Sequence, residues 1–450
     1  MLQKIIYSIF PGISEQDKNR EGYRHFYKSL IFHFRPRLVH RKTLDFTLTF
    51  GLGGMAFVLI LLLFGTGLLM KFYYLPFPDK AYESITYLSN NVPFGSLIRN
   101  IHYWSANILI IVVFLHFLRV FFTSAFHPPR QFNWVIGLSL FIIILLFNLT
   151  GYLLPWDQLS FWAITICTGM MDYIPMIGKW MQNIVRGGAD VGSSTLSIFY
   201  ATHTAFLPAA LIIIMPFHFW RVRKAGGLVI PLSSEEKSED PDIRIPAIPD
   251  LIVREIVTAL VLIAVILFIS ILFDAPLGNK ANPGLSPNPT KAPWYFMGFQ
   301  EILMHLHPII AIFVIPFLMV VGLLTIAYSR YSESREGIWF VSSRGRSTAV
   351  ASSVMALIVT PIIIILDEYV FDFPAWMLGF SPVVSNGLIP LCIVISGFYV
   401  LYLFLVKFYS PDKNEKVQMV FVFFLTVFII LTITGIWFRG TSMKLLWPFG

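Results

Sequence analysis

Long apolar runs separated by short polar stretches dominate this 450-residue chain. Each run approaches or exceeds the ~20 residues that an α-helix needs to cross the hydrocarbon core of a bilayer. The pattern therefore predicts about nine transmembrane helices. They are expected near residues 46–72, 98–123, 134–153, 199–222, 251–273, 309–328, 348–367, 386–407 and 417–438.

Composition agrees with an all-α, polytopic membrane bundle. Charged residues make up 13% of the chain and hydrophobic residues 56%, whereas a soluble domain is about 25% charged. The two cysteines, Cys167 and Cys392, form no CxxC or CxxCH motif, which excludes a c-type haem attachment and a zinc site. The first 45 residues lack the apolar core of a cleavable signal peptide.

Charge along the chain indicates its orientation. Residues 1–45 carry nine Lys and Arg among aromatic and aliphatic residues, which is typical of a helix on a membrane surface. Nucleic-acid binding is disfavoured because the rest of the chain is lipid-embedded. With the N-terminus cytoplasmic, 24 of the 33 Lys and Arg lie on the inner side, as the positive-inside rule requires. Residues 226–250 are polar and contain proline, and they are expected to form a cytoplasmic linker.

Two of the expected helices each carry two histidines. His102 and His116 are 14 residues apart, and His203 and His218 are 15 apart. At 100° per residue each pair stays within about 40–60° of one helix face, and about 21–23 Å separates its members. Because these second and fourth spans run parallel, His102 is expected to face His203 on the outer side. By the same parity His116 faces His218 on the inner side.

Facing imidazoles are suited to binding haem iron from both sides. A single histidine in an apolar helix is usually a core residue bonded to a carbonyl. Four histidines in two matched pairs instead favour two haems stacked across the membrane, inside a four-helix core. A haem-free transporter whose histidines relay protons is the alternative, and a visible spectrum would distinguish the two.

Glycines and arginines follow the same spacing. The first and third spans carry glycines fourteen residues apart, which would let a flat macrocycle approach the backbone or would serve ordinary helix packing. These are Gly53 and Gly67, then Gly137 and Gly151. Cationic residues near the histidines could pair with haem propionates, although the inner ones also serve as topology charges. These are Arg99, Arg119, Arg221 and Arg223.

Two aromatic stretches are expected on the outer side, at residues 151–170 with a loop to about 198, and at 274–307. Trp156, Trp162 and Trp294 fit an interfacial aromatic belt. Two such stretches on one face could instead wall a pocket for a flat, lipid-soluble ligand.

Several strings resemble a known family. LIRNIHYWSA, FLHFLRV, GYLLPWDQLSFWA and WYF, together with the histidine spacings, resemble cytochrome b of the quinol–cytochrome c oxidoreductases, the bc and bf complexes, over about residues 46–370. The 15-residue spacing is similar to that of the chloroplast-type bf proteins, whose two halves are separate chains. Here residues 46–225 would be the di-haem N-terminal domain and 251–370 the C-terminal domain, fused in one chain. Residues 371–450 add two further helices, for which packing against other subunits is one interpretation.

The resemblance implies an enzymatic function and a set of partners. It implies a quinol:cytochrome c oxidoreductase subunit with two haem b, a quinol oxidation site outside, a quinone reduction site inside and coupled proton translocation. A Rieske-type iron–sulfur subunit, a c-type cytochrome subunit, membrane lipids and a second copy of the chain are the implied partners. The implied location is a bacterial plasma membrane, with many spans and a cytoplasmic N-terminus.

The resemblance also assigns residues. His102 and His203 would ligate a low-potential outer haem, and His116 and His218 a high-potential inner haem. Arg99 would pair with a propionate, while Asp250, with Arg223, would belong to the inner quinone site. The outer quinol site would comprise Pro155, Trp156, Trp162, Pro293, Trp294, Tyr295, Phe296 and Glu301.

Two departures from the family pattern change the expected chemistry. The family's Pro-Glu-Trp-Tyr motif reads Ala292-Pro293-Trp294-Tyr295 here, so Pro293 replaces a glutamate that takes a proton from quinol. Glu301 is the nearest downstream carboxylate and the candidate replacement, unless it is only a helix-start charge. Gly51 stands where bf proteins carry a cysteine, which rules out covalent attachment of a third, inner haem and leaves non-covalent binding open. Pro293 and the basic, fused architecture favour a low-potential quinone such as menaquinone.

A di-haem membrane anchor of a dehydrogenase is the alternative function. Such an anchor would exchange electrons with quinone at one site only. Anchors usually have four or five spans and lack the two aromatic outer stretches. Inhibitors specific for the outer and inner quinone sites would distinguish the two functions.

Overall fold

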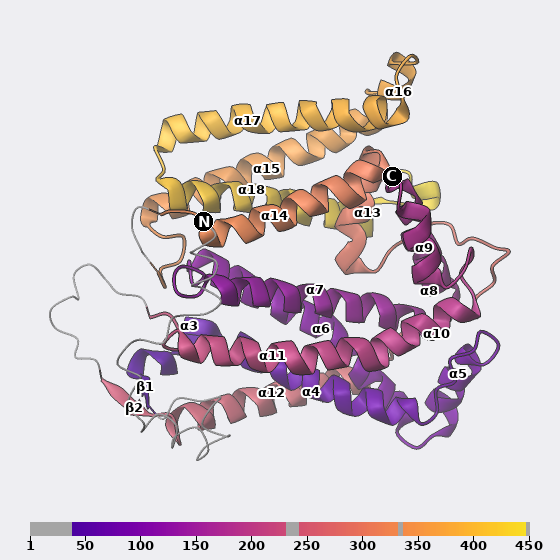
Figure 1. The fold of residues 1–450 in the computed structure, drawn as a ribbon, viewed down its shortest axis with the longest axis horizontal. Helices are drawn as coiled ribbons and strands as arrows, with labels where there is room; N and C mark the ends of the chain where they lie inside the picture. The colour runs from indigo at the N-terminus through magenta and orange to yellow at the C-terminus, as the bar shows by residue number, and fades with distance from the viewer. Residues whose placement is uncertain (1–37, 231–242, 332–335, 447–450) are drawn as a thin grey trace. The chain divides into compact units, whose positions relative to one another are not determined.

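The computed structural model describes residues 38–230, 243–331 and 336–446 (Figure 1). Within these residues, nine helices are long and apolar enough to cross a membrane, which confirms the predicted all-α, multi-pass architecture. They are α4 (Leu52–Lys71), α6 (Gly95–Phe122), α7 (Gln131–Leu153), the continuous helix of α10, η5 and α11 (Ser193–Lys224), α12 (Asp250–Leu272), η7 with α14 (Ile310–Tyr328), α15 (Ser343–Tyr369), η8 with α17 (Val384–Tyr409) and α18 with η9 (Lys413–Phe438).

The beginning of the first span differs from the prediction. Phe50 and Gly51 adopt left-handed backbone conformations, with φ of 53° and 65°, so they separate α3 (Phe46–Thr49) from α4. Residues 1–37, where most of the surface helix was predicted, lie outside the described part of the chain.

Short elements connect the long helices. Two short strands, β1 (Leu38–His40) and β2 (Arg244–Pro246), pair antiparallel, which the sequence did not predict. The connecting helices are η3 (Arg41–Leu44), α5 (Ala81–Asn91), α8 (Gln158–Gly169), η4 (Met170–Tyr173), α9 (Gly178–Arg186), η6 (Trp294–Phe296), α13 (Met297–His305), α16 (Phe373–Trp376) and η10 (Thr441–Met443).

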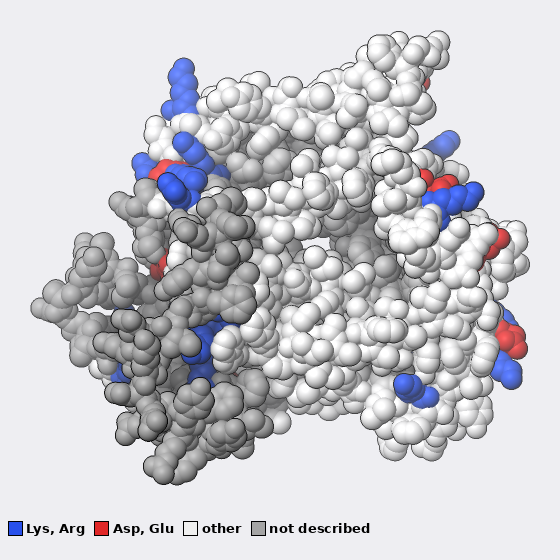
Figure 2. Space-filling view, viewed as in Figure 1, with Lys and Arg blue, Asp and Glu red and all other residues white. Residues whose placement is uncertain are grey.

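The helix flanks are apolar and exposed. On the face shown in Figure 2, the described charged side chains gather near helix ends, and the long flanks between them are uncharged. On α12, Leu260, Phe268 and Ile271 are each at least 60% exposed. Soluble proteins rarely expose apolar patches of this extent, so these flanks face lipid.

The chain forms two compact units. The first comprises residues 1–152, 199–276 and 327–339, and the second comprises residues 153–198, 277–326 and 340–450. These units interleave along the sequence. The two units therefore do not correspond to segments before and after residues 226–250. The predicted division into an N-terminal and a C-terminal family domain stays a prediction.

In the first unit, side chains of α6 form hydrogen bonds with the backbone at the C-terminal end of α12. The Asn100 side chain donates to Ser270 O (3.0 Å) and accepts from the Ala275 N–H (2.8 Å). Trp104 Nε1 donates to Phe273 O at 2.8 Å. These bonds satisfy carbonyl groups that the end of a helix leaves without a partner. The α4 helix packs along α6, and α12 packs against both.

In the second unit, α15 packs against α18 through small residues. The buried residues of α15 recur about every four positions, so they line one face of the helix. They are Gly345, Thr348, Ala349, Ser352, Ala356, Thr360 and Ile364. Ser352 Oγ donates to Met419 O at 3.0 Å, and the hydroxyls of Ser353 and Thr426 lie 3.0 Å apart. Small residues allow close approach of membrane helices, and α18 uses another face to pack on α13.

Candidate functional site

The four predicted histidines all lie in the helices of the first unit (Figure 1). His102 and His116 are on α6, His203 is in η5 and His218 is on α11. The ring centres of His102 and His203 are 6.3 Å apart. Two imidazole nitrogens that bind one metal ion at about 2 Å place their ring centres roughly 6 Å apart. The distance therefore fits a metal ion held between the two rings.

A π-helical turn explains the unequal histidine spacing. His203 lies in η5 (Thr202–Phe206), where the Leu207 N–H bonds to Thr202 O, five residues back. Pro208, in the first turn of α11, has no N–H to continue the regular pattern. A π turn inserts one extra residue into a helix. His203 and His218, 15 residues apart, are therefore spaced along their helix much as His102 and His116, 14 residues apart, are along the regular α6.

Each of the four predicted glycines faces one of the four histidines. A Cβ atom on Gly151 would lie 2.7 Å from His203 Cε1, which is closer than real Cβ contacts allow. The corresponding distances to Cε1 are 3.3 Å for Gly67 and His102, 3.7 Å for Gly53 and His116, and 3.5 Å for Gly137 and His218. The glycines on α4 and α7 thus let the imidazole rings lie against the backbone of a neighbouring helix.

Threonines orient the first pair of imidazoles. Thr66 Oγ1 lies 2.9 Å from His102 Nδ1, and Thr150 Oγ1 lies 3.1 Å from His203 Nδ1. Both hydroxyls donate their own proton to a carbonyl one turn back, at 2.7 and 2.8 Å. The threonine oxygen therefore accepts, and each Nδ1 carries the proton. This tautomer leaves the lone pair on Nε2, the atom needed for metal ligation.

The second pair lacks this hydroxyl partner. Nδ1 of His116 is buried without a hydrogen-bond partner among the described residues, and no hydroxyl there bonds to Nδ1 of His218. A histidine that donates from Nδ1 is a more basic ligand through Nε2. The two pairs would therefore give a bound haem unequal potentials, with the lower potential at His102 and His203. The residues present fit two bis-histidine haem sites.

The arginines flanking the histidines differ in their surroundings. Arg99 donates to Ala275 O at 2.8 Å and to Pro276 O at 2.6 Å, so it anchors the segment that follows α12. Arg119 is 4% exposed, and its Nε donates to Leu48 O at 2.9 Å. Its Nη2 is buried without a hydrogen-bond partner among the described residues. A buried cationic N–H of this kind fits an anionic group such as a haem propionate.

Hydrogen bonds join the two predicted aromatic stretches within the second unit. Trp156 O accepts from the Ala281 N–H at 3.1 Å, and the Gln158 N–H donates to Asn279 O at 2.8 Å. Trp162 Nε1 donates to Asn282 O at 3.3 Å. The stretches that were predicted to share one face are thus in direct contact.

Several of the predicted quinol-site residues have distinctive conformations. Trp156, which follows Pro155, is buried and has a φ of 52°, a sparsely populated conformation found at functional sites. Residues Trp294–Phe296 form η6, with Pro293 as the N-cap. For the predicted inner site, Asp250 begins α12, and Arg223 lies in the last turn of α11.

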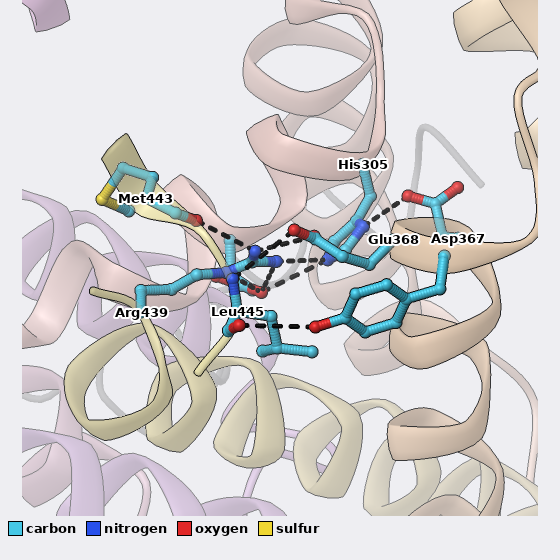
Figure 3. Close-up of polar contacts among 8 residues, drawn as sticks. His305, Asp367, Glu368, Arg439, Met443 and Leu445 are labelled. Atoms are coloured by element: carbon cyan, nitrogen blue, oxygen red, sulfur yellow. Dashed lines mark hydrogen bonds and ion pairs between the residues drawn. The ribbon is translucent and has the colours of Figure 1, made fainter. Parts of the chain in front are cut away.

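Glu301 lies in a buried ionic cluster. Figure 3 labels its partners Arg439 and His305. Its carboxylate is fully buried and forms an ion pair with Arg439 at 2.6 Å. His305 Nε2 lies 3.2 Å from Glu301 Oε1. Burial raises the pKa of Glu301, but hydrogen bonds and charges from His305 and Arg439 outweigh it and hold that pKa below its usual value. Glu301 is therefore ionised at neutral pH.

Sequence reasoning missed the threonines and the partners of Glu301. Thr66 and Thr150 each precede one of the predicted glycines, so the repeated Thr-Gly pair was a readable signal. The spacing of Glu301 and His305 by four residues also predicts contact on a helix. Nothing in the sequence indicates that Arg439 would reach Glu301.

Known proteins resemble this chain over the segment that carries the four histidines. The family described as Cytochrome b/b6/petB matches residues 40–226, which include all four histidines. Proteins named cytochrome b6 from Prochlorococcus marinus strains AS9601 and MIT 9313 are each 45% identical over 175 residues, covering 39% of this chain and 80% of theirs. A solved structure titled "Hyperthermophilic respiratory Complex III" has a similar fold. Its TM-score is 0.63 over 94% of this chain and 98% of that one, at 24% identity.

Replacing Gly151 by Ala should displace the His203 ring, because the new Cβ would overlap it. We expect the purified variant to lose most of one b-type absorbance component in a redox-difference spectrum. Gly65→Ala is the control, since no atom lies within 4 Å of a Cβ built there. Equal spectra for the two variants would contradict the packing role of Gly151.

Replacing Thr150 by Val should raise the midpoint potential of the haem held by His203, because a weaker electron-donating ligand favours the reduced iron. His203 Nδ1 keeps a second acceptor in the variant, Phe147 O at 3.1 Å. Loss of one hydrogen bond of about 0.5–1.5 kcal/mol therefore sets an upper range of about 20–60 mV. Potentiometric titration measures the shift. Thr204→Val is the control, because the Thr204 hydroxyl bonds to Tyr200 O of its own helix. A fall in potential would refute the proposed ligand polarisation.

Proposed function

Because this chain belongs to the cytochrome b/b6 family, we propose that it is the di-haem b-type subunit of a membrane complex that oxidises quinol. The observation that carries the proposal is the arrangement of the four histidines. The 6.3 Å separation of the His102 and His203 ring centres supports ligation of one metal ion by both. The glycine contacts support a second, similar site at His116 and His218.

The histidines and their neighbours would hold two haem b groups. His102 and His203 hold the outer, low-potential haem, and His116 and His218 hold the inner, high-potential one. Bound haem supplies one-electron redox chemistry. Thr66 and Thr150 fix the tautomer of the outer ligands, and Arg119 offers a buried N–H to a propionate of the inner group.

Quinol oxidation is assigned to the outer aromatic stretches. Pro155, Trp156 and Trp162 form one wall, and Trp294, Tyr295 and Phe296 form the other. A quinol that binds here loses two electrons and two protons. One electron passes to a Rieske-type iron–sulfur subunit and then to a c-type cytochrome, and the haem groups that the four histidines would hold would accept the other. The protons leave on the outer side.

Quinone reduction is assigned to the inner side, where Asp250 and Arg223 lie at helix ends. Asp250 supplies a proton-exchanging carboxylate, and Arg223 a positive charge. The N-terminus is cytoplasmic, as the distribution of Lys and Arg supports, and the chain works as a homodimer in a bacterial plasma membrane. Pro293 favours menaquinone as the substrate. The result is a quinol:cytochrome c oxidoreductase that moves protons outward.

A di-haem dehydrogenase anchor would use quinone at only one site. The nine long helices and the hydrogen-bonded aromatic stretches favour the bc-type assignment. Sensitivity of quinol oxidation to both outer-site and inner-site inhibitors would support two quinone sites. Sensitivity to only one class would favour the anchor.

His102→Ala should remove one b-haem component from the redox-difference spectrum and leave the other, because each haem depends on its own histidine pair. Quinol-driven reduction of the remaining haem through the outer site should fall at least tenfold. His127→Ala is the control, since His127 is also buried in the first unit but lies outside the four-histidine set. Survival of both components in His102→Ala would refute the pairing.

A further inference from the structure

The C-terminal helix α18 and the residues after it hold the segment around Pro293 within the second unit. Lys291 Nζ donates to Ile436 O at 2.8 Å, and Asn288 bonds to Ser442. A Cβ on Gly298 would lie 2.7 Å from Phe428 and from Thr432. The last helix of the chain is thus fitted to the loop assigned to quinol.

Arg439 adds ion pairs to the contact between the C-terminal segment and helix α13. It is 2% exposed and donates to Glu301 on α13 at 2.6 Å and to Glu368 on α15 at 2.7 Å. Its Nη1 also donates to Met443 O at 3.0 Å. A buried ion pair costs desolvation, so hydrophobic packing would hold the helices together equally well. The ionic cluster therefore needs a reason beyond stability.

His305 links the buried end of the cluster to its exposed end (Figure 3). Its Nε2 faces Glu301 at 3.2 Å, and its Nδ1 faces Asp367 at 2.6 Å. Side-chain exposure rises from 0% at Glu301 to 14% at His305 and 24% at Asp367. The three groups form a continuous line from the interior towards the surface.

We propose that Glu301, His305 and Asp367 are the proton exit of the outer quinol site, and that Arg439 positions them. The proposal rests on the proposed function and replaces the glutamate that Pro293 cannot supply. Glu301 lies seven residues after Trp294, which is about two helical turns and nearly the same face. The exit therefore begins ~10 Å along the chain axis from Trp294, on the side of the helix that Trp294 shares.

The charges of the cluster couple proton entry to proton release. Burial lowers the pKa of His305, but the hydrogen bonds and charges of Asp367 and Glu301 outweigh it and raise the pKa to about 9. His305 is thus a cation between two carboxylates. When Glu301 takes a proton, His305 loses one of the two anions that stabilise its charge, and its pKa falls.

The quinol O–H bond breaks as its electron leaves to the iron–sulfur partner, and an O–H bond forms on Glu301. The Nδ1–H bond of His305 then breaks, Asp367 gains that proton, and Asp367 releases it to water. The neutral imidazole keeps its Nε2–H, so a half-turn of the ring must bring the bare nitrogen to Glu301. Transfer of the Glu301 proton to that nitrogen then restores the starting charges.

The other polar groups facing the cluster keep fixed roles. Glu368 pairs with Arg439 and makes no described bond to His305. The Tyr369 hydroxyl, also on α15, donates to Leu445 O at 3.4 Å, away from the imidazole. Arg439 balances Glu301 and keeps its carboxylate pointed at His305. The segment that follows α18 and η9 thus supplies the positive charge that holds the proposed exit in place.

Asp367→Asn and Glu368→Gln form a matched pair, because both carboxylates are 24% exposed and neighbours on α15, but only Asp367 bonds to His305. In the haem-loaded complex we expect Asp367→Asn to slow quinol oxidation about tenfold or more. The alkaline limb of its pH profile should move to lower pH, since His305 loses an anionic partner. Glu368→Gln should change the rate less than twofold.

The two outcomes separate the exit from the proposed function. If the wild-type complex binds haem but oxidises no quinol, both proposals fail. If the wild type oxidises quinol and Asp367→Asn matches it in rate and pH profile, only the exit fails. Redox-difference spectra of all variants should equal that of the wild type, which excludes loss of haem as the cause.

Stability against pH gives a readout that needs no quinol. The folded-state pKa of His305, about 9, lies above its usual 6.5, so its stabilising effect is full below pH ~6.5 and is lost as pH rises through 9. The Tm of the wild type should fall across this range, and Asp367→Asn should flatten the fall. An identical Tm profile in His305→Gln would show that the imidazole is not the titrating group and would overturn the exit.

Discussion

Four imidazoles inside apolar helices are the constraint on which the rest of the first unit depends. In a membrane interior each imidazole needs a partner for its polar atoms, because water is absent. For His102 and His203 the structure meets this need with a threonine on each Nδ1, and the two ring centres lie 6.3 Å apart, a distance that fits a metal ion between them. Helix contacts, glycine positions and the π turn all serve that arrangement.

Packing and electronics are set by the same short motif. In the Thr-Gly pairs at 66–67 and 150–151, the glycine leaves room for the edge of an imidazole ring. The threonine one residue earlier accepts a hydrogen bond from Nδ1–H of that ring. The position of each imidazole ring and the basicity of its Nε2 atom therefore depend on neighbouring residues of the same helix. The pair at His116 and His218 has the glycines without the hydroxyls, so two haems bound as proposed would differ in potential.

Sequence reasoning was effective where the periodicity of the helix sets the answer. Apolar runs predicted the nine spans, and the fourteen-residue spacings predicted the facing histidines and glycines. It was weaker where one local deviation matters: the 15-residue spacing needs the π turn at Thr202–Phe206, and no periodic pattern encodes it. It could not predict that Arg439 meets Glu301, because 138 residues separate them and only the packing of α13, α15 and α18 brings them together.

The loss of the family's glutamate at position 293 need not remove proton transfer, because a carboxylate can be displaced along the same helix if a counter-charge moves with it. An isolated Glu301 in an apolar interior would be protonated and could not act as a base. Arg439 prevents this, and His305 with Asp367 gives the proton a direction outward. A buried carboxylate that stays ionised needs a counter-charge, and Arg439, the residue directly after η9, supplies it. The proposed exit would therefore link the substitution at Pro293 to the chain added after residue 370.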